Sequence, residues 1–266
     1  GCAIMSSSLQ SNSGSLSGYI PDDNTTDAVL DLGNKIFGQW GLSFYAYVPA
    51  GKEGYFNFQG TVPIGSGTFP VGNIFLNQDG LDPGNGLVDF GTGNPDYQAP
   101  FSYPEGEWFQ VIANFDISAG ISTSTWSMSV DGDVIVAEGT PFASWDDVNG
   151  VWDYTDTQSL GGIDLYSIST NNQMFFDDFV YQEGFLGTQD NIEAKGFRSA
   201  MSNGTLTLRA QENINSVAIY NMLGQQVYNA NVNSTNSTVN MTNLANGTYI
   251  VKVNINGVEG SVKVIR

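Results

Sequence analysis

The feature that most constrains the fold is a period-two alternation of apolar and polar side chains, which recurs in both halves of the chain. Alternate side chains of a β-strand point to opposite faces of a sheet, so this pattern predicts strands with one buried face. The clearest apolar faces are Leu42, Phe44, Ala46 and Val48, then Phe109, Val111, Ala113 and Phe115, then Trp126, Met128 and Val130. The Asp131–Gly132 step after the third face favours the positive φ angles of a tight hairpin turn. Charged residues make up 13% of the chain, against about 25% in ordinary soluble domains, which excludes long solvated helices.

Absent residue types exclude several classes of function. The 266 residues include no histidine, which excludes a Ser-His-Asp triad, a histidine general base and a histidine-bearing zinc site. The single cysteine, Cys2, excludes an internal disulfide and a thiolate metal cluster. The net charge of −19 argues against nucleic acid and anionic membrane surfaces as partners. No stretch approaches the roughly 18 consecutive apolar residues of a membrane span, so we expect no membrane-spanning segment.

Charge is unevenly distributed along the chain. Residues 1–186 hold 23 acidic and two basic residues, whereas the remainder holds four acidic and six basic residues. The shift falls at a polar, glycine-containing stretch without periodicity, which is typical of a linker between two folding units. We therefore predict a domain at 1–186, a linker at 187–202 and a second domain at 203–266.

The second domain repeats the strand pattern over a shorter length. Its apolar faces are separated by turn residues at Asn203–Gly204, Leu223–Gly224–Gln225, Asn246–Gly247 and Asn256–Gly257. A chain of about 65 residues cannot bury two separate cores, so these strands predict one small antiparallel sandwich.

Specific motifs lie in this second domain. They are Tyr220-Asn221-Met222-Leu223-Gly224-Gln225-Gln226-Val227, then Leu244-Ala245-Asn246-Gly247-Thr248-Tyr249-Ile250-Val251-Lys252-Val253, then the terminal Val262-Lys263-Val264-Ile265-Arg266. The region resembles the type A C-terminal sorting domain of the type IX secretion system of Bacteroidota. The residues that match the family's recognition elements are Tyr220, Asn221, Gly224, Leu244, Gly247, Tyr249 and Lys263. The resemblance implies the type IX secretion machinery as a partner, export across the outer membrane, and a secreted or outer-membrane surface location.

The first domain contains pieces of a second family pattern. A strand from Trp108 to Asp116 precedes Val130-Asp131-Gly132, and Phe176-Asp177-Asp178-Phe179-Val180 comes late in the domain. Over about residues 19–183 this arrangement resembles the laminin-G and concanavalin A-like jelly rolls. We therefore expect an all-β protein, with a concanavalin A-like jelly-roll sandwich followed by a small immunoglobulin-like antiparallel β-sandwich.

The resemblance also raises the possibility of catalysis, because concanavalin A-like jelly rolls include glucanases. Enzymes resembling laminarinases place two carboxylates about 5 Å apart on one strand, in an E-x-D-x-x-E pattern. That pattern is absent, and Glu105-Gly106-Glu107 has suitable spacing for two acids but lacks the third. We predict that the protein is not an enzyme.

Carbohydrate binding is the leading hypothesis for the first domain. Sugars stack their apolar C–H faces on aromatic rings and need amide and carboxylate partners for their hydroxyl groups. Trp145, Trp152 and Tyr154 lie among aspartate and asparagine in a loop-like stretch and are the predicted binding residues for a polysaccharide or surface glycan. The alternative is that these rings pack under the loop as a satellite cluster.

Calcium is the cofactor that the composition favours, because hard oxygen ligands abound and soft ligands are missing. Alternation along the strand at 174–181 predicts that either Asp177 or Asp178 points inward, where a carboxylate needs a partner. The jelly-roll resemblance implies a structural calcium ion at these two residues.

The combined prediction is a non-catalytic carbohydrate-binding protein that is exported by its C-terminal domain. Two alternatives remain open. The first is a structural or adhesive surface protein that binds a protein partner. The second is a fragment of a larger exported enzyme whose catalytic part lies outside this sequence.

Overall fold

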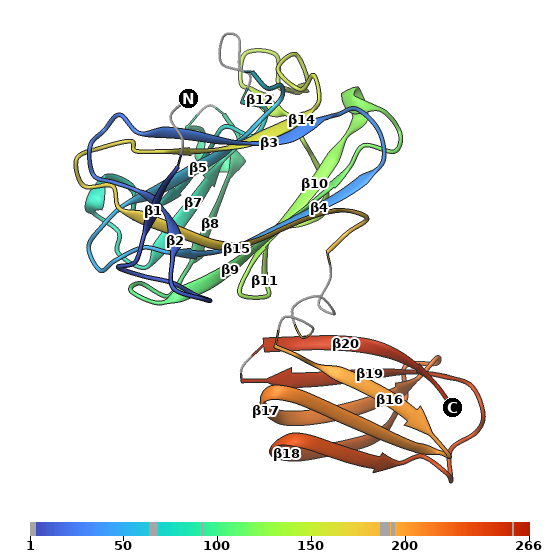
Figure 1. Ribbon diagram of the computed structural model, residues 1–266. Coiled ribbons are helices and arrows are strands. Elements are labelled where there is room, and N and C mark those ends of the chain that lie inside the picture. Colours follow the sequence, from blue (N-terminus) through green and yellow to red (C-terminus); the bar gives the residue numbers. More distant parts are fainter. Residues whose placement is uncertain (1–3, 64–68, 92, 187–191, 193–194, 257) are drawn as a thin grey trace. The chain divides into compact units, whose positions relative to one another are not determined.

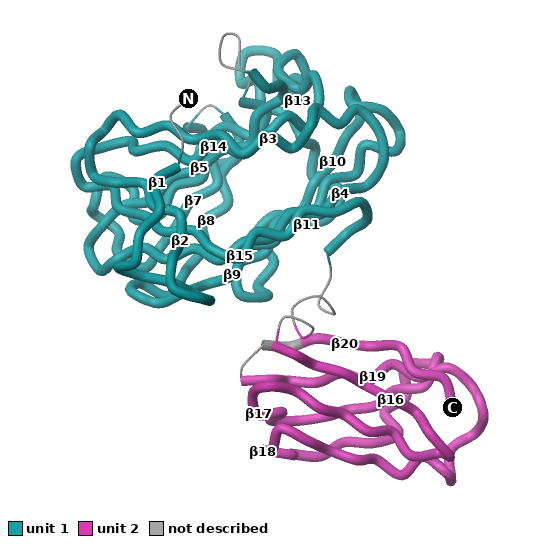
Figure 2. Tube along the Cα trace, in the orientation of Figure 1, with its two compact units in different colours: residues 1–186 teal, residues 187–266 magenta. Residues whose placement is uncertain are grey.

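The computed structural model is built almost entirely of antiparallel β-strands and divides into two compact units, Gly1–Leu186 and Gly187–Arg266 (Figures 1 and 2). The structure describes residues 4–63, 69–91, 93–186, 192, 195–256 and 258–266. Cys2 lies outside the described residues.

Unit 1 contains two large sheets. The first has the strand order β1 (Met5–Ser7), β2 (Ser17–Ile20), β15 (Met174–Glu183), β4 (Gln39–Tyr47), β9 (Trp108–Asp116), β10 (Thr125–Val130) and β11 (Asp133–Pro141). The second has the order β3 (Asp27–Lys35), β14 (Leu160–Tyr166), β5 (Gly54–Gln59), β6 (Asn73–Leu76), β7 (Asn85–Asp89) and β8 (Gln98–Ser102). A separate hairpin pairs β12 (Ser144–Asp146) with β13 (Val151–Asp153), and short 3₁₀ helices lie at Gln78–Gly80, Pro95–Tyr97 and Ile121–Thr123.

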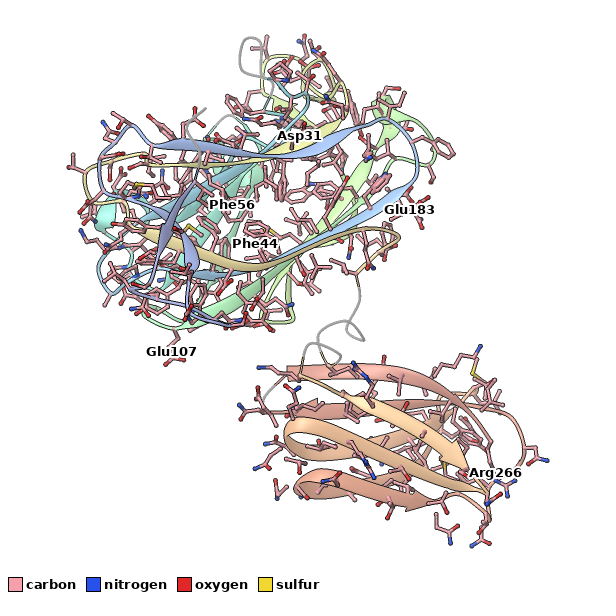
Figure 3. All side chains as sticks on the ribbon, in the orientation of Figure 1. Asp31, Phe44, Phe56, Glu107, Glu183 and Arg266 are labelled. Carbon is pink, nitrogen blue, oxygen red and sulfur yellow. The ribbon has the colours of Figure 1, made fainter. Side chains whose placement is uncertain are left out.

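The core of unit 1 lies between the two sheets. Phe44 on β4 and Phe56 on β5 meet edge to face with ring centroids 5.5 Å apart, and both point into this layer (Figure 3). Phe58 on β5 meets Phe115 on β9 in the same way, at 5.0 Å. Such pairs hold two sheets face to face through apolar burial and ring geometry. The all-β prediction is therefore confirmed, and unit 1 is a β-sandwich.

The predicted alternation agrees with the observed burial. All eleven apolar side chains named for the three faces are 3% exposed or less. Asp131 and Gly132 adopt φ angles of 48° and 91° and connect β10 to β11, so the predicted hairpin is confirmed. The stretch at 145–154 was predicted to be loop-like, and it instead contains the β12–β13 hairpin.

Unit 2 is a five-stranded antiparallel sheet of β16 (Arg198–Ser202), β17 (Thr205–Asn221), β18 (Gln226–Asn240), β19 (Thr248–Ile255) and β20 (Val258–Ile265). Its core is a cluster separate from that of unit 1 and includes Leu206, Val217, Val251 and Ile255. The 17 residues of β17 form one long strand, whose first part pairs with β16 and whose second part pairs with β19. Among the residues described for both units, none of the helices is long and apolar enough to cross a membrane.

The linker prediction of 187–202 is wrong at its C-terminal part. Arg198–Ser202 is β16 and pairs along its whole length with β17. Ile192 and Phe197 belong to the core of unit 2, with exposures of 0% and 1%. Residues 187–191 and 193–194 lie outside the described residues. Two isolated apolar residues in a polar stretch form no periodic pattern, which is why the sequence did not reveal that they anchor unit 2.

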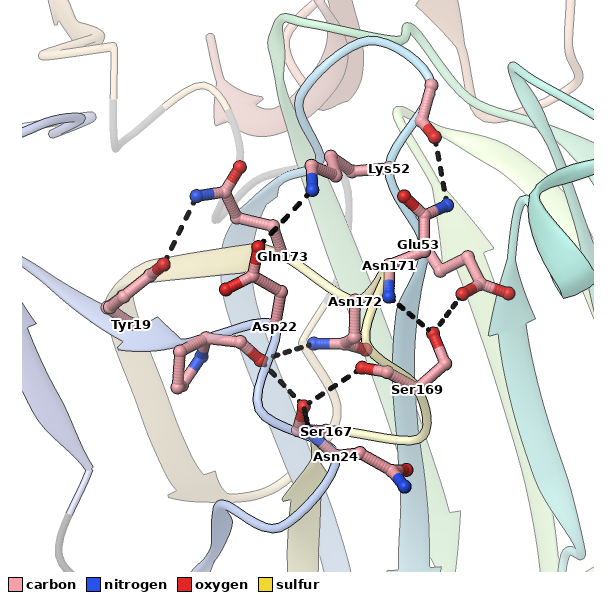
Figure 4. A network of polar contacts seen from close by, with 12 residues as sticks. Tyr19, Asp22, Asn24, Lys52, Glu53, Ser167, Ser169, Asn171, Asn172 and Gln173 are labelled. Carbon is pink, nitrogen blue, oxygen red and sulfur yellow. Dashed lines mark hydrogen bonds and ion pairs between the residues drawn. The ribbon is translucent and has the colours of Figure 1, made fainter.

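A buried polar network fixes the loops at one edge of unit 1 (Figure 4). The carboxylate of Glu53, 3% exposed, accepts a hydrogen bond from the hydroxyl of Ser169, whose oxygen accepts the backbone N–H of Asn171 at 2.9 Å. The hydroxyl of Ser167 donates to the carbonyl of Pro21 at 2.6 Å. The network therefore ties three chain segments together and uses Glu53 as a structural acceptor.

Candidate functional site

Four aromatic side chains cross the outer face of the seven-stranded sheet, and we call them the aromatic row: Tyr19, Phe175, Tyr47 and Trp108. Each comes from a different strand, and the register places them directly opposite one another along β2, β15, β4 and β9. Neighbouring ring centroids lie 4.8, 5.9 and 5.5 Å apart. Four strands spaced by about 4.8 Å give a row of about 14 Å.

The row does not belong to the hydrophobic core of unit 1. Tyr19, Tyr47 and Trp108 are partly exposed, and Phe175 is covered to 2% exposure between Tyr19 and Tyr47. The hydroxyl of Tyr19 accepts a hydrogen bond from Gln173 Nε2 at 3.1 Å, which holds the end of the row (Figure 4). An ordered, partly exposed set of rings on a sheet is suited to contact with an apolar ligand face.

The alternation along residues 42–48 does not predict this row. It buries Leu42, Phe44, Ala46 and Val48, and Tyr47 therefore lies on the opposite, outer face of the same strand. The alignment with Trp108 and Phe175 depends on the register between strands that are far apart in sequence. Such a row could be sought in a sequence as aromatic residues that stand, in several alternating strands, at positions where the alternation expects polar side chains.

The structure brings Trp145 and Trp152 together on the β12–β13 hairpin, where they are a cross-strand pair with ring centroids 5.5 Å apart. Tyr97 stacks on Trp145 at 3.6 Å with an angle of 11° between the rings. Trp152 also contacts Phe90 and packs against the core of unit 1. These rings therefore cover one another, as the satellite-cluster alternative expects. Carbohydrate binding by this hairpin cluster stays a prediction.

Polar groups fasten the hairpin cluster. The carboxylate oxygen Oδ1 of Asp147 accepts hydrogen bonds from Trp145 Nε1 at 2.9 Å and Asn94 Nδ2 at 2.6 Å. Tyr154 does not share these contacts. Its hydroxyl donates to the carbonyl of Ser124 at 3.1 Å. Burial raises the pKa of its phenol.

The expectation that Asp177 or Asp178 points inward is wrong. A β-bulge interrupts the pairing of β15 with β4 between Asp177 and Val180, and Asp178 adopts a φ of 50°. Asp177 precedes the bulge and shares the outer face with Phe175, so it is partly exposed. The bulge breaks the period of two after it, so Asp178 is exposed instead of pointing inward. Asp177 Oδ2 accepts the backbone N–H groups of Asn12 and Ser13, at 2.9 and 3.1 Å. Within the described residues no three acidic or cysteine side chains form a group that could hold a metal, and calcium at these residues stays a prediction.

Another carboxyl pair lies on the outer face of the six-stranded sheet. Asp164 on β14 is 6% exposed, and its Oδ2 accepts a hydrogen bond from Asn57 Nδ2 at 2.9 Å. The pKa of Asp164 is raised to about 7, first by burial and then by a hydrogen bond with Asp27, against the opposing effect of the hydrogen bond from Asn57. Asp164 Oδ1 is buried and has no hydrogen-bond donor within reach among the described residues.

In unit 2, three of the predicted sorting residues build the turn between β17 and β18. Asn221 Oδ1 accepts the backbone N–H groups of Leu223 and Gln225, both at 3.0 Å. Gly224 has a φ of 77°, a left-handed conformation that glycine adopts without strain, as expected of the turn that the sequence predicts at 223–225. The hydroxyl of Tyr220 donates to Gln226 Oε1 at 3.0 Å across the turn.

The other predicted sorting residues lie on β19, on β20 and in the loop before β19. Tyr249 is 6% exposed and donates its hydroxyl to the carbonyl of Ala245 at 2.8 Å. Leu244 packs against the core of unit 2, and Lys263 on β20 is exposed. Gly247 has an ordinary φ, and a Cβ atom there would have no neighbour within 4 Å. The backbone conformation therefore favours glycine at position 224 and does not favour it at position 247.

Comparison with known proteins gives no match among curated proteins. Among solved structures, the chain is similar to a DUF3244 family protein with an immunoglobulin-like β-sandwich fold from Bacteroides vulgatus, with 17% identity and a TM-score of 0.27. That alignment covers 30% of this chain and 91% of the other. Residues 202–266 match the family model of the secretion system C-terminal sorting domain. The match supports export of the chain through the type IX secretion system of Bacteroidota, with a secreted or cell-surface location.

Proposed function

We propose that the protein is an exported, non-catalytic glycan-binding protein, in which unit 2 directs export and unit 1 meets the ligand. The family match at residues 202–266 supports the role of unit 2. The separate core of unit 2 suits a sorting module that packs without help from its cargo. On the fold of unit 1, we propose the concanavalin A-like class, supported by two antiparallel sheets around one core.

Removal of the sorting unit tests the export role. In a Bacteroidota host with an active type IX system, we expect the full precursor to reach the medium or the cell surface. The same precursor without residues 203–266 is expected to stay inside the cell envelope, because the element recognised for export is gone. Fractionation and immunoblotting measure both. Truncated protein in the medium would contradict the role.

The glycan-binding role is carried by one observation, the aromatic row on the outer face of the seven-stranded sheet. Its partly exposed rings offer apolar contacts to the C–H faces of sugar rings. Gln110 lies two residues along β9 from Trp108, on the same face, and its side-chain amide can bond to sugar hydroxyls. A row that crosses four strands suits an extended polysaccharide better than a single sugar.

Substitution of Trp108 tests this site. We expect Trp108→Ala to weaken retention on insoluble polysaccharides by about tenfold, since a lost aromatic contact of about 1.4 kcal/mol is a factor of ten in affinity. Trp40→Ala is the control for loss of a partly exposed tryptophan. Trp40 lies at the far end of β4 and packs against the core, on the other face from the aromatic row, so the folded variant should be retained like the wild type.

The same assay decides between the aromatic row and the hairpin cluster. If Trp145→Ala abolishes retention and Trp108→Ala does not, the binding site is the hairpin cluster predicted from the sequence, and the row is not the site. If the folded wild-type protein is retained on none of the polysaccharides, the alternative of a surface protein that binds a protein partner is favoured.

A further inference from the structure

The motif residues of unit 2 gather at one end of its sheet. Asn221 at the end of β17 pairs with Tyr249 at the start of β19, and Tyr249 pairs with Val264 near the end of β20. Gly247 and Arg266 exchange backbone hydrogen bonds of 3.2 and 2.9 Å. We call this region the motif end and define it as residues 220–225, 242–249 and 263–266.

The chain terminus is held in place at the motif end. The guanidinium of Arg266, labelled in Figure 3, donates to Asn246 Oδ1 at 2.8 Å and to the carbonyl of Thr242 at 2.6 Å. Together with the backbone bonds to Gly247, these contacts fix the last residue against the loop before β19. Three segments far apart in sequence therefore form one ordered surface.

Among the residues that the structure describes in unit 2, large exposed apolar side chains occur on this surface alone. In the part of unit 2 that the structure describes, they are Met222, Leu223 and Ile265, with exposures of 67%, 84% and 68%. Single exposed apolar residues are common on proteins, but a group of them on one ordered surface marks an interaction site. The hydrogen bonds of the turn use the backbone of Leu223 and the side chain of Asn221, so the turn itself does not require apolar residues at 222 and 223.

Gly247 gives an independent indication. Its backbone does not adopt a positive φ, and no residue other than its two chain neighbours comes within 4 Å of where its Cβ would be. The fold of the isolated chain therefore does not require glycine at this position. An absent side chain leaves the backbone next to the C-terminus open to close approach by another protein.

The charge pattern limits the chemistry of the contact. Residues 213–251, which include the turn and the loop before β19, contain no acidic or basic residue. Lys263 is exposed on β20, two residues before Ile265. The side chains that protrude most from the turn are thus neutral and apolar, which suits a desolvated contact better than an ionic one.

We propose that the motif end docks on a receptor protein of the export machinery, with Met222, Leu223 and Ile265 entering a neutral apolar pocket of that receptor and Gly247 permitting close backbone approach. The inference rests on the export function proposed above and assigns that function a contact surface. Tyr220, Asn221 and Gly224 act within it as positioning residues, because they shape the turn that presents Met222 and Leu223.

The test compares export of full-length variants in a host with an active type IX system. We expect Met222→Ser/Leu223→Ser and, separately, Gly247→Ala to lower the exported fraction by about tenfold or more, since the central contacts of an interface carry most of its affinity. Leu81→Ser and Val148→Ser are matched controls, because each removes an exposed apolar side chain from unit 1, with exposures of 83% and 92%. Both controls are expected to be exported like the wild type.

A second measurement separates docking from folding. Thermal unfolding of the purified full-length proteins should give the same melting temperature for unit 2 in the wild type and in the motif-end variants. Export of folded Met222→Ser/Leu223→Ser and Gly247→Ala variants at the wild-type level would overturn the proposal. A motif-end variant that loses both stability and export would also overturn it, because the surface would then serve the fold. Failure of the wild type itself to be exported would refute the export function instead.

Discussion

Replacing Asp164 with asparagine is expected to stabilise unit 1 at pH 8 by about 3 kcal/mol and to leave its stability at pH 4 nearly unchanged. The wild-type carboxyl has a pKa of about 7 in the folded state, mainly because it is buried and also because it shares a hydrogen bond with Asp27. Its ordinary pKa is 3.8. Between these two values the folded state holds a proton that the unfolded state has released, so stability falls as the pH rises.

Asparagine removes this dependence because it is neutral at every pH and has a similar shape. Its amide can donate to Asp27 as the protonated carboxyl does, and its oxygen can still accept from Asn57 Nδ2. Urea unfolding at pH 4, 6 and 8 measures the effect. The free energy of unfolding of the variant should exceed that of the wild type by an amount that increases steadily through this range. The difference should reach its full value above pH 7.

The control for this experiment is Asp133→Asn, which removes an exposed carboxylate at the start of β11. Unit 1 is strongly acidic, so any lost negative charge lowers general repulsion at high pH. Only the stabilisation by Asp164→Asn that exceeds the stabilisation by Asp133→Asn reports on the buried pair of Asp164 and Asp27. Equal pH profiles for the two variants would show that Asp164 is ionised in the folded protein at neutral pH.

Local patterns in the sequence predicted the individual strands well. The face of Phe109, Val111 and Phe115 is buried as expected, because a strand packed on one side must alternate. The turn at Asp131–Gly132 was also predictable, since its conformation depends on two adjacent residues. Motif residues Tyr220 and Asn221 were found for the same reason, because their spacing is visible in one short stretch.

Features that depend on pairing between distant strands were not predictable in this way. The aromatic row needs Phe175 opposite Tyr19 and Tyr47, residues separated from it by more than a hundred positions. The bulge at Asp177 changes the direction of side chains without any marker such as glycine in the sequence. Alternation alone therefore assigned an inward carboxylate that the bulge removes, and it could not align rings across a sheet.

The need for glycine at a given position also depends on contacts between distant segments. Substitution of Gly60 is the change for which we expect the largest loss of stability. A Cβ atom at Gly60 would lie 1.9 Å from the backbone carbonyl oxygen of Asp156 and 3.0 Å from its carbon. The segment around Asp156 cannot simply move away, because Ser159 Oγ donates to the carbonyl of Gly60 at 2.7 Å and Thr157 Oγ1 donates to that of Phe142 at 2.8 Å. We expect Gly60→Ala to lower the free energy of unfolding by about 3 kcal/mol or more, since overpacking against backbone leaves little room for relaxation.

The comparison with Gly51→Ala makes this prediction specific. Gly51 has a φ of 74°, but a Cβ atom there would have no neighbour within 4 Å. A left-handed conformation costs an alanine about 1 kcal/mol, so Gly51→Ala should be the milder change although only Gly51 has an unusual backbone angle. Thermal unfolding should then show a loss of about 10 °C for Gly60→Ala and about 3 °C for Gly51→Ala. The opposite ranking would mean that backbone conformation, and not the close approach of the segment around Asp156, explains the glycine at position 60.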